Sequence, residues 1–188
     1  MHATYLLSPR LVLAIAVLAL SAAVSVPPAR AATAEEIDAK SDATLDRFKR
    51  EVGGAQSLIG MAKGVLVFPD VAKAGFGIGG EYGEGALRVG GKSVDYYSTA
   101  AASIGFQLGI QSKAILLIFL DESALARFRQ AEGWEVGVDG SVALVEVGAG
   151  GMIDTTNIKA PIVAFVMTNK GLMFNLTLEG SKFTRLER

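Results

Sequence analysis

Residues 75–86, with the sequence GFGIGGEYGEGA, carry the pattern that decides the fold. Glycines occupy positions 75, 77, 79, 83 and 85, whereas the even positions hold Phe76, Ile78, Tyr82 and Ala86. Successive side chains of an extended chain point to opposite faces, so this alternation predicts a strand with one nearly bare face. Glycine weakens a strand, and such a face therefore needs the close approach of a helix, another part of the sheet or a ligand. We expect tight packing or strong sheet curvature to be the reason.

The same alternation extends along the rest of the chain. It recurs near residues 101–110, and further apolar runs predict strands at 65–68, 114–120, 134–138, 141–147, 161–168 and 172–178. Pro69-Asp70 is expected to close the first of these, and Asn169-Lys170-Gly171 to form a hairpin turn between the last two. Residues 121–130 interrupt the strands as a short helix, with Leu125 and Phe128 facing inward.

The segment 33–52 has the opposite character, because its apolar residues recur at helical spacing among dense charges. Thr33 and Glu36 have the spacing of a capping box, and Gly53-Gly54 should stop the helix. A second helix at 55–62 is expected to end with Gly64 as its C-cap. The predicted fold class is α+β: N-terminal amphipathic helices, then a curled, mostly antiparallel, glycine-rich sheet resembling a barrel or sandwich, with one short inserted helix.

The first 31 residues have the composition of a secretory signal peptide. Arg10 precedes an apolar run at 11–24, and the small-residue site Ala29-Arg30-Ala31 follows two prolines. The run is shorter than the roughly 20 residues that a spanning helix needs. We therefore expect residues 1–31 to be removed on export, with the product periplasmic or secreted and possible association with a membrane. Residues 32–188 should form one domain, with a helical part at 32–62 and a β-rich core at 63–188.

Composition excludes several kinds of chemistry. The chain has no Cys and a single histidine, His2, which lies in the segment expected to be removed. Without thiol or imidazole, cysteine and serine–histidine hydrolysis and histidine-ligated metal sites are excluded. The 16 basic and 19 acidic side chains that remain argue against a nucleic-acid binder. We expect no enzymatic activity, no catalytic residue, no metal site and no cofactor.

Two motifs bear on nucleotide binding and on acid catalysis. Residues 75–80 satisfy the G-x-G-x-x-G pattern of dinucleotide binding, but a strand-like segment follows where that function needs a helix, so no nucleotide is expected. Acid catalysis would need a carboxylate pair, and the candidates are Glu81 with Glu84 and Glu135 with Asp139. The first pair has opposite parity in a strand and should face apart. The second shares parity and could share a surface.

Several glycine-containing stretches together resemble the SYLF domain family, a lipid-binding domain that binds actin in its yeast members. The matching stretches lie between about Leu58 and Leu186, at residues 62–68, 73–80, 83–87, 105–109, 133–139, 171–173 and 178–181. The resemblance implies a non-catalytic module that binds membrane phospholipids, with phosphoinositides as ligands of eukaryotic members. It also implies an exported protein of the bacterial cell envelope. The alternative is an envelope structural or protein-interaction domain without a lipid ligand, and no protein partner can be named.

Basic residues near strand ends are the candidates for contact with phospholipid head groups. Lys63 and Lys73 fall within the best-matching stretches, and Arg88 lies close by in the sequence. The helix at 33–52 is a poorer candidate. It carries six acidic residues against four basic ones, so an anionic bilayer would repel it.

Overall fold

The computed structural model describes residues 31–105, 111–145, 153, 158–168, 171–172 and 178–188. The predicted signal peptide lies almost entirely outside these residues. Residues 32–188 form one compact unit. Among the described residues, no helix combines the length and the apolar character needed to cross a membrane.

The chain begins with two helices, α2 (Ala34–Glu51) and α3 (Ala55–Met61). The predicted capping box is confirmed: the Thr33 hydroxyl accepts the Glu36 N–H at 3.2 Å, and the Glu36 carboxylate accepts the Thr33 N–H at 2.9 Å. Gly54 has φ +85°, a conformation that suits glycine, and it separates the helices. The predicted C-cap at Gly64 is wrong, because the extended backbone of Ala62 ends α3 and Gly64 already begins the first strand.

The remaining chain forms an eight-stranded sheet with the strand order β4-β8-β2-β1-β3-β6-β5, and β7 pairs with β6. The strands are β1 (Gly64–Val89), β2 (Lys92–Gly105), β3 (Gln111–Phe119), β4 (Gly133–Glu135), β5 (Ala143–Leu144), β6 (Ile162–Thr168), β7 (Gly171–Leu172) and β8 (Lys182–Leu186). Helix α4 (Glu122–Gln130) follows β3, as predicted. The pairs are antiparallel except β5–β6, so the predicted α+β class with a curled, mostly antiparallel sheet is confirmed as a half-barrel.

Strand β1 explains much of the glycine pattern. The prediction that Pro69-Asp70 closes this strand is wrong. The two residues lie within β1, at a register shift between Phe68 and Val71. The N-terminal part of β1 pairs with β3, and the part from Gly77 onward pairs with β2. A Cβ atom on Gly85 would lie 2.2 Å from the Val67 carbonyl oxygen. One on Gly83 would lie 2.7 Å from the Asp70 carbonyl oxygen. At Gly83 and Gly85 a side chain is therefore absent because another part of the same strand, β1, packs closely against this face.

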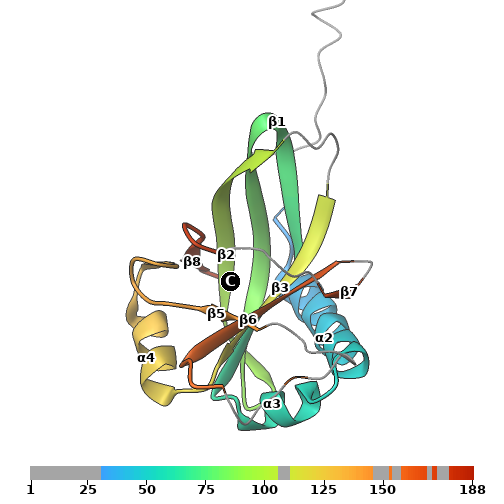
Figure 1. Cartoon of the computed structure of the whole chain (residues 1–188), viewed down its shortest axis with the longest axis vertical. Coiled ribbons are helices and arrows are strands. Elements are labelled where there is room, and N and C mark those ends of the chain that lie inside the picture. Colours follow the sequence, from blue (N-terminus) through green and yellow to red (C-terminus); the bar gives the residue numbers. More distant parts are fainter. Residues whose placement is uncertain (1–30, 106–110, 146–152, 154–157, 169–170, 173–177) are drawn as a thin grey trace, which may run out of the picture. The chain divides into compact units, whose positions relative to one another are not determined.

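Strand β6, most of β3 and the start of β1 are buried on both faces. Figure 1 shows α2 and α4 on opposite sides of the strands. One core includes α2 and α3 residues and alternate sheet residues, among them Phe48, Leu58, Val67, Leu116 and Phe165. The other includes α4 and the opposite sheet face, with Leu66, Phe68, Tyr97, Leu117, Phe128, Trp134 and Phe183. As predicted, Leu125 and Phe128 face inward.

Tyr97 is a polar side chain inside the second core. Its ring lies 4.9 Å from that of Phe128, and the residue is 1% exposed. Its hydroxyl has no hydrogen-bond partner among the described residues. Burial, and secondly the negative charge of Asp95, raises the pKa of Tyr97 to about 12. The folded protein therefore keeps this phenol neutral where an unfolded chain would ionise it.

We expect Tyr97→Phe to change how stability depends on pH. From about pH 10 upward the unfolded tyrosine loses its proton while the folded one keeps it, so stability falls as the pH rises toward 12. The two-unit difference corresponds to about 3 kcal/mol, and the variant should lack that part of the decline. At pH 7 the variant should be about 1 kcal/mol more stable, since an unsatisfied hydroxyl is removed. Urea unfolding at pH 7, 10 and 11 measures both effects, and parallel pH profiles would contradict the assignment.

Candidate functional site

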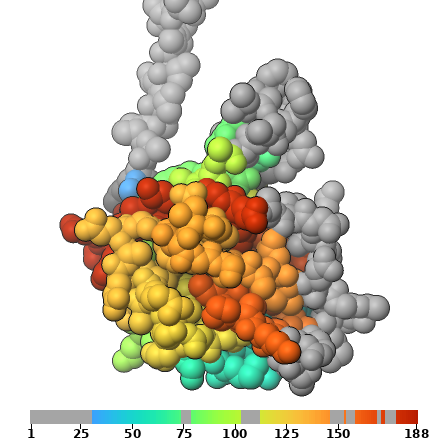
Figure 2. Space-filling view, turned by 60° about the vertical axis from the view of Figure 1, so that its left-hand side comes forward, coloured from blue at the N-terminus to red at the C-terminus, as the bar shows by residue number. Residues whose placement is uncertain are grey.

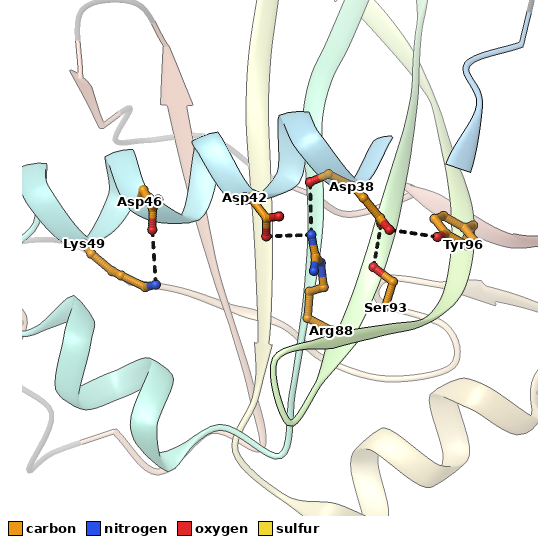
Figure 3. A network of polar contacts seen from close by, with 7 residues as sticks. All are labelled: Asp38, Asp42, Asp46, Lys49, Arg88, Ser93 and Tyr96. Atoms are coloured by element: carbon orange, nitrogen blue, oxygen red, sulfur yellow. Dashed lines mark hydrogen bonds and ion pairs between the residues drawn. The ribbon is translucent and has the colours of Figure 1, made fainter. Parts of the chain in front are cut away.

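An acidic face of α2 lies against the turn between β1 and β2. Arg88 donates from Nη2 to the Asp42 carboxylate at 2.7 Å and to the Asp38 carbonyl oxygen at 3.0 Å. The Asp38 carboxylate also accepts the hydroxyls of Ser93 at 2.6 Å and Tyr96 at 3.2 Å. Figure 3 shows these contacts, with the acids along α2 and their partners on the hairpin. The network fixes α2 on the sheet.

Burial and the Asp38 charge raise the pKa of Tyr96, so its hydroxyl remains a donor to Asp38. The Arg88 side chain is only 11% exposed, whereas that of Asp42 is 63% exposed. The Arg88 Nε atom is buried without a hydrogen-bond partner among the described residues. Arg88 therefore has a structural role in holding α2, and it also lines the cavity beside the network.

That cavity, which we call the α2 cleft, has a volume of about 390 Å³ and lies among α2, α3 and the β1–β2 turn. Its apolar lining comes from Leu45, Ile59, Ala62 and Val65. Its charged lining comes from Asp42, Asp46, Lys49, Lys63 and Arg88. The cleft thus combines an aliphatic wall with cations, the combination that suits an amphiphilic ligand with an anionic group.

Lys63 is the cation most available to a ligand. Its backbone N–H donates to the Phe119 carbonyl oxygen at 2.8 Å, which fixes the start of the side chain. The residue is exposed, and its ammonium group has no ion-pair partner among the described residues. Lys49 lies 3.4 Å from the Asp46 carboxylate, a loose pair that is worth little.

The three basic residues nominated from the sequence separate into two groups. Lys63 and Arg88 line the same cleft, although 25 positions separate them in the chain. Lys73 lies farther along β1, opposite Gln111 of β3, and does not line the cleft. Sequence reasoning missed Lys49, whose only signal was its place in the last turn of an amphipathic helix.

Three of the four candidate acids for catalysis, Glu81, Glu84 and Asp139, are engaged in other contacts. Glu81 pairs with Lys113 at 2.6 Å, and Glu84 pairs with Arg188 at 2.6 Å. The Asp139 carboxylate accepts the backbone N–H of Glu135 at 2.7 Å, which belongs to a turn. These contacts stabilise the fold and do not pair one acid with another.

The structure also bears on the nucleotide motif and on metal binding. Residues 75–80 lie within β1, which continues as a strand to Val89, so the helix that a phosphate-binding loop needs does not follow. Within the described part of the chain, no group of three or more His, Cys, Asp or Glu side chains could share a metal ion.

The fold and the cleft define a class of protein: an α+β domain in which a curled sheet, covered on both faces, carries an amphipathic cleft beside its N-terminal helix. Residues 100–187 match the family Ysc84, described as Las17-binding protein actin regulator. This match covers slightly less than half of the chain and shows similarity to the Ysc84 (SYLF) domain family, a family of non-catalytic modules that bind lipids or actin. The resemblance seen in the sequence is thereby confirmed, although the match does not reach the stretches before residue 100. No curated protein matches the chain.

Proposed function

We propose that the chain is an exported, non-catalytic lipid-binding module of the bacterial cell envelope that takes a phospholipid in the α2 cleft. The observation that carries the proposal is the combination of Lys49 and Lys63 with an aliphatic wall in one cavity. The cations would meet the phosphate, and the wall at Leu45, Ile59 and Val65 would meet the first carbons of the lipid. Export rests on the signal-like segment at 1–31, and non-catalytic binding is the character of the family.

Charge on α2 favours the cleft over the helix surface as the place of contact. Two acids that lie on the α2 face toward the hairpin, Asp38 and Asp42, already have partners in the Arg88 network. Lys40 is also occupied, since its ammonium lies 2.9 Å from the Asp70 carboxylate, and this hydrogen bond raises the pKa of Lys40. Lys63, with no such partner in the described part of the chain, would then be the main cation for a phosphate.

We expect Lys63→Glu to weaken binding to anionic vesicles about tenfold or more. A lysine near an anionic surface contributes about 1 kcal/mol, and reversal of its charge doubles the change. Cosedimentation of the protein with phosphatidylglycerol–phosphatidylcholine vesicles measures the effect, and binding should weaken further as salt is added. Protein purified from the envelope fraction is suitable, with its N-terminal residue read by mass spectrometry.

Lys159→Glu is the matched control, because Lys159 is exposed and does not line the cleft. It should bind vesicles nearly as well as the unchanged protein. Equal losses in both variants would mean that only net charge matters, and the cleft assignment would fail. Absence of binding by the unchanged protein to anionic and zwitterionic vesicles alike would reject lipid binding and favour an envelope protein-interaction domain.

A further inference from the structure

A second cavity, which we call the arginine cavity, lies on another part of the domain. It has a volume of about 600 Å³ and is lined by the end of α4, the start of β2 and the residues at and beyond the end of β8. Three arginines line it: Arg129, Arg185 and Arg188. Figure 2 shows α4 in yellow and the segment near the C-terminus in red on the same face of the molecule. The SYLF match includes Arg129 and Arg185, but it assigns them no role.

The floor of this cavity is a buried carboxylate with two cations. The Asp95 side chain is 2% exposed and pairs with Nε of Arg129 at 2.8 Å and with Nη2 of Arg185. The three residues come from β2, α4 and β8, which brings together positions far apart in the sequence. One carboxylate cannot neutralise two guanidiniums, so this centre retains an excess positive charge.

Both arginines keep donors for a ligand. Toward the residues that the structure describes, Arg129 uses only its Nε and Arg185 only one Nη, while a guanidinium carries five N–H groups. Their side chains are 42% and 53% exposed, so these groups are accessible. Asp95 holds the two guanidinium groups next to each other, an arrangement that suits a bidentate contact with the oxygens of a phosphate.

The rim of the cavity has the opposite charge. Glu132 and Glu187 line it and are exposed, and the last carbonyl groups of α4 end there at Ala131. Helix C-termini favour cations. Arg188 already forms an ion pair with Glu84, so Arg129 and Arg185 carry the positive charge at the floor of the cavity. A ligand complementary to this distribution has an anionic group placed deep and a cationic group at the rim.

We propose that the arginine cavity binds a phosphate ester that carries an ammonium group, with the phosphate on Arg129 and Arg185 and the ammonium near Glu132 and Glu187. Such a group occurs both as a free small molecule and as a lipid head group. This site is distinct in its residues from the α2 cleft, and neither binding requires the other.

Calorimetric titration with O-phosphoethanolamine tests the proposal. The protein should bind it, and should bind glycerol 1-phosphate, which lacks the ammonium, at least several-fold more weakly. Arg185→Gln should weaken binding of O-phosphoethanolamine at least tenfold, because the glutamine amide can still donate to Asp95 but cannot form the charged fork. Vesicles that contain phosphatidylethanolamine distinguish the two sources: binding that Arg185→Gln weakens assigns the lipid head group, whereas binding of O-phosphoethanolamine without binding to these vesicles assigns the free ester.

Arg127→Gln is the matched control: Arg127 lies on the same helix, is exposed, and contacts Ser123 at 3.0 Å instead of Asp95. It should leave the titration unchanged, and the melting temperature of each variant shows that the fold is intact. No heat with O-phosphoethanolamine, equal affinity for glycerol 1-phosphate, or equal losses in the two arginine variants would each overturn the proposal. Lys63→Glu should leave this titration unchanged, so failure of the α2 cleft and failure of the arginine cavity are distinguishable.

Discussion

Gly85→Ala should unfold the domain or cost about 3 kcal/mol or more of stability. The added methyl carbon would lie 2.2 Å from the Val67 carbonyl oxygen and 2.7 Å from Cδ1 of Phe68. Atoms at that separation overlap strongly, and overpacking a buried site typically costs about 1–3 kcal/mol even when side chains can adjust. The nearest atom here belongs to the backbone of the same strand, so relief would require the two parts of β1 to separate. Urea unfolding, or the soluble yield where the protein does not fold, measures the effect.

Gly60→Ala is the control for the same chemical change. Gly60 lies inside α3, and an added Cβ would meet no atom within 4 Å. Alanine has the higher helix propensity, so this variant should match or exceed the unchanged protein by up to about 1 kcal/mol. If the two alanine variants were equally stable, the close approach within β1 would not be the reason for the glycine.

Phe128→Ala should cost about 3–5 kcal/mol, since its ring is fully buried at the centre of the second core. The ring lies 4.9 Å from Tyr97, 5.0 Å from Phe119 and 5.5 Å from Trp134. Removing it opens a cavity among these rings and weakens the packing of α4 on the sheet. Trp134 is the only tryptophan, so its fluorescence reports the change directly: we expect a red shift together with a lower unfolding midpoint in urea.

The conservative variant Phe128→Leu separates volume from aromatic contact. It keeps most of the buried apolar surface, so the loss should be clearly smaller than that of the alanine variant. A fluorescence maximum unchanged in Phe128→Ala would contradict the packing of this ring on Trp134.

Much of the fold could be predicted because its signals are local. The capping box at Thr33 and the inward spacing of Leu125 and Phe128 depend only on neighbouring residues, and both are confirmed. The glycine alternation predicted a strand with a closely packed face, although not that the same strand packs on itself. That contact joins Gly85 to Val67 across a reversal of chain direction, and no short sequence window contains it.

Two features could not be predicted for a related reason. Strand β8 alternates exposed residues with the buried Phe183, and its lysine and arginine make it look like a solvated segment. It is a strand because β2 and β4 pair with its two edges. The α2 cleft depends in the same way on tertiary packing. Charge and position nominated Lys63, Lys73 and Arg88 alike. Only the sheet topology shows that Lys63 and Arg88 line the same cleft.

The position of β8 has a consequence for how the domain folds. β8 joins the sheet between β4 and β2, and the Ser98 hydroxyl contacts the Thr184 carbonyl oxygen across 86 positions of sequence. Contacts at such separation must await closure of a long loop, which slows folding. Until β8 pairs, the β2 edge lacks this partner strand and Phe68 lacks the Phe183 ring that stacks on it at 5.4 Å. An unpaired strand edge and exposed aromatic surface both favour association between chains, so pairing of β8 protects the domain against aggregation.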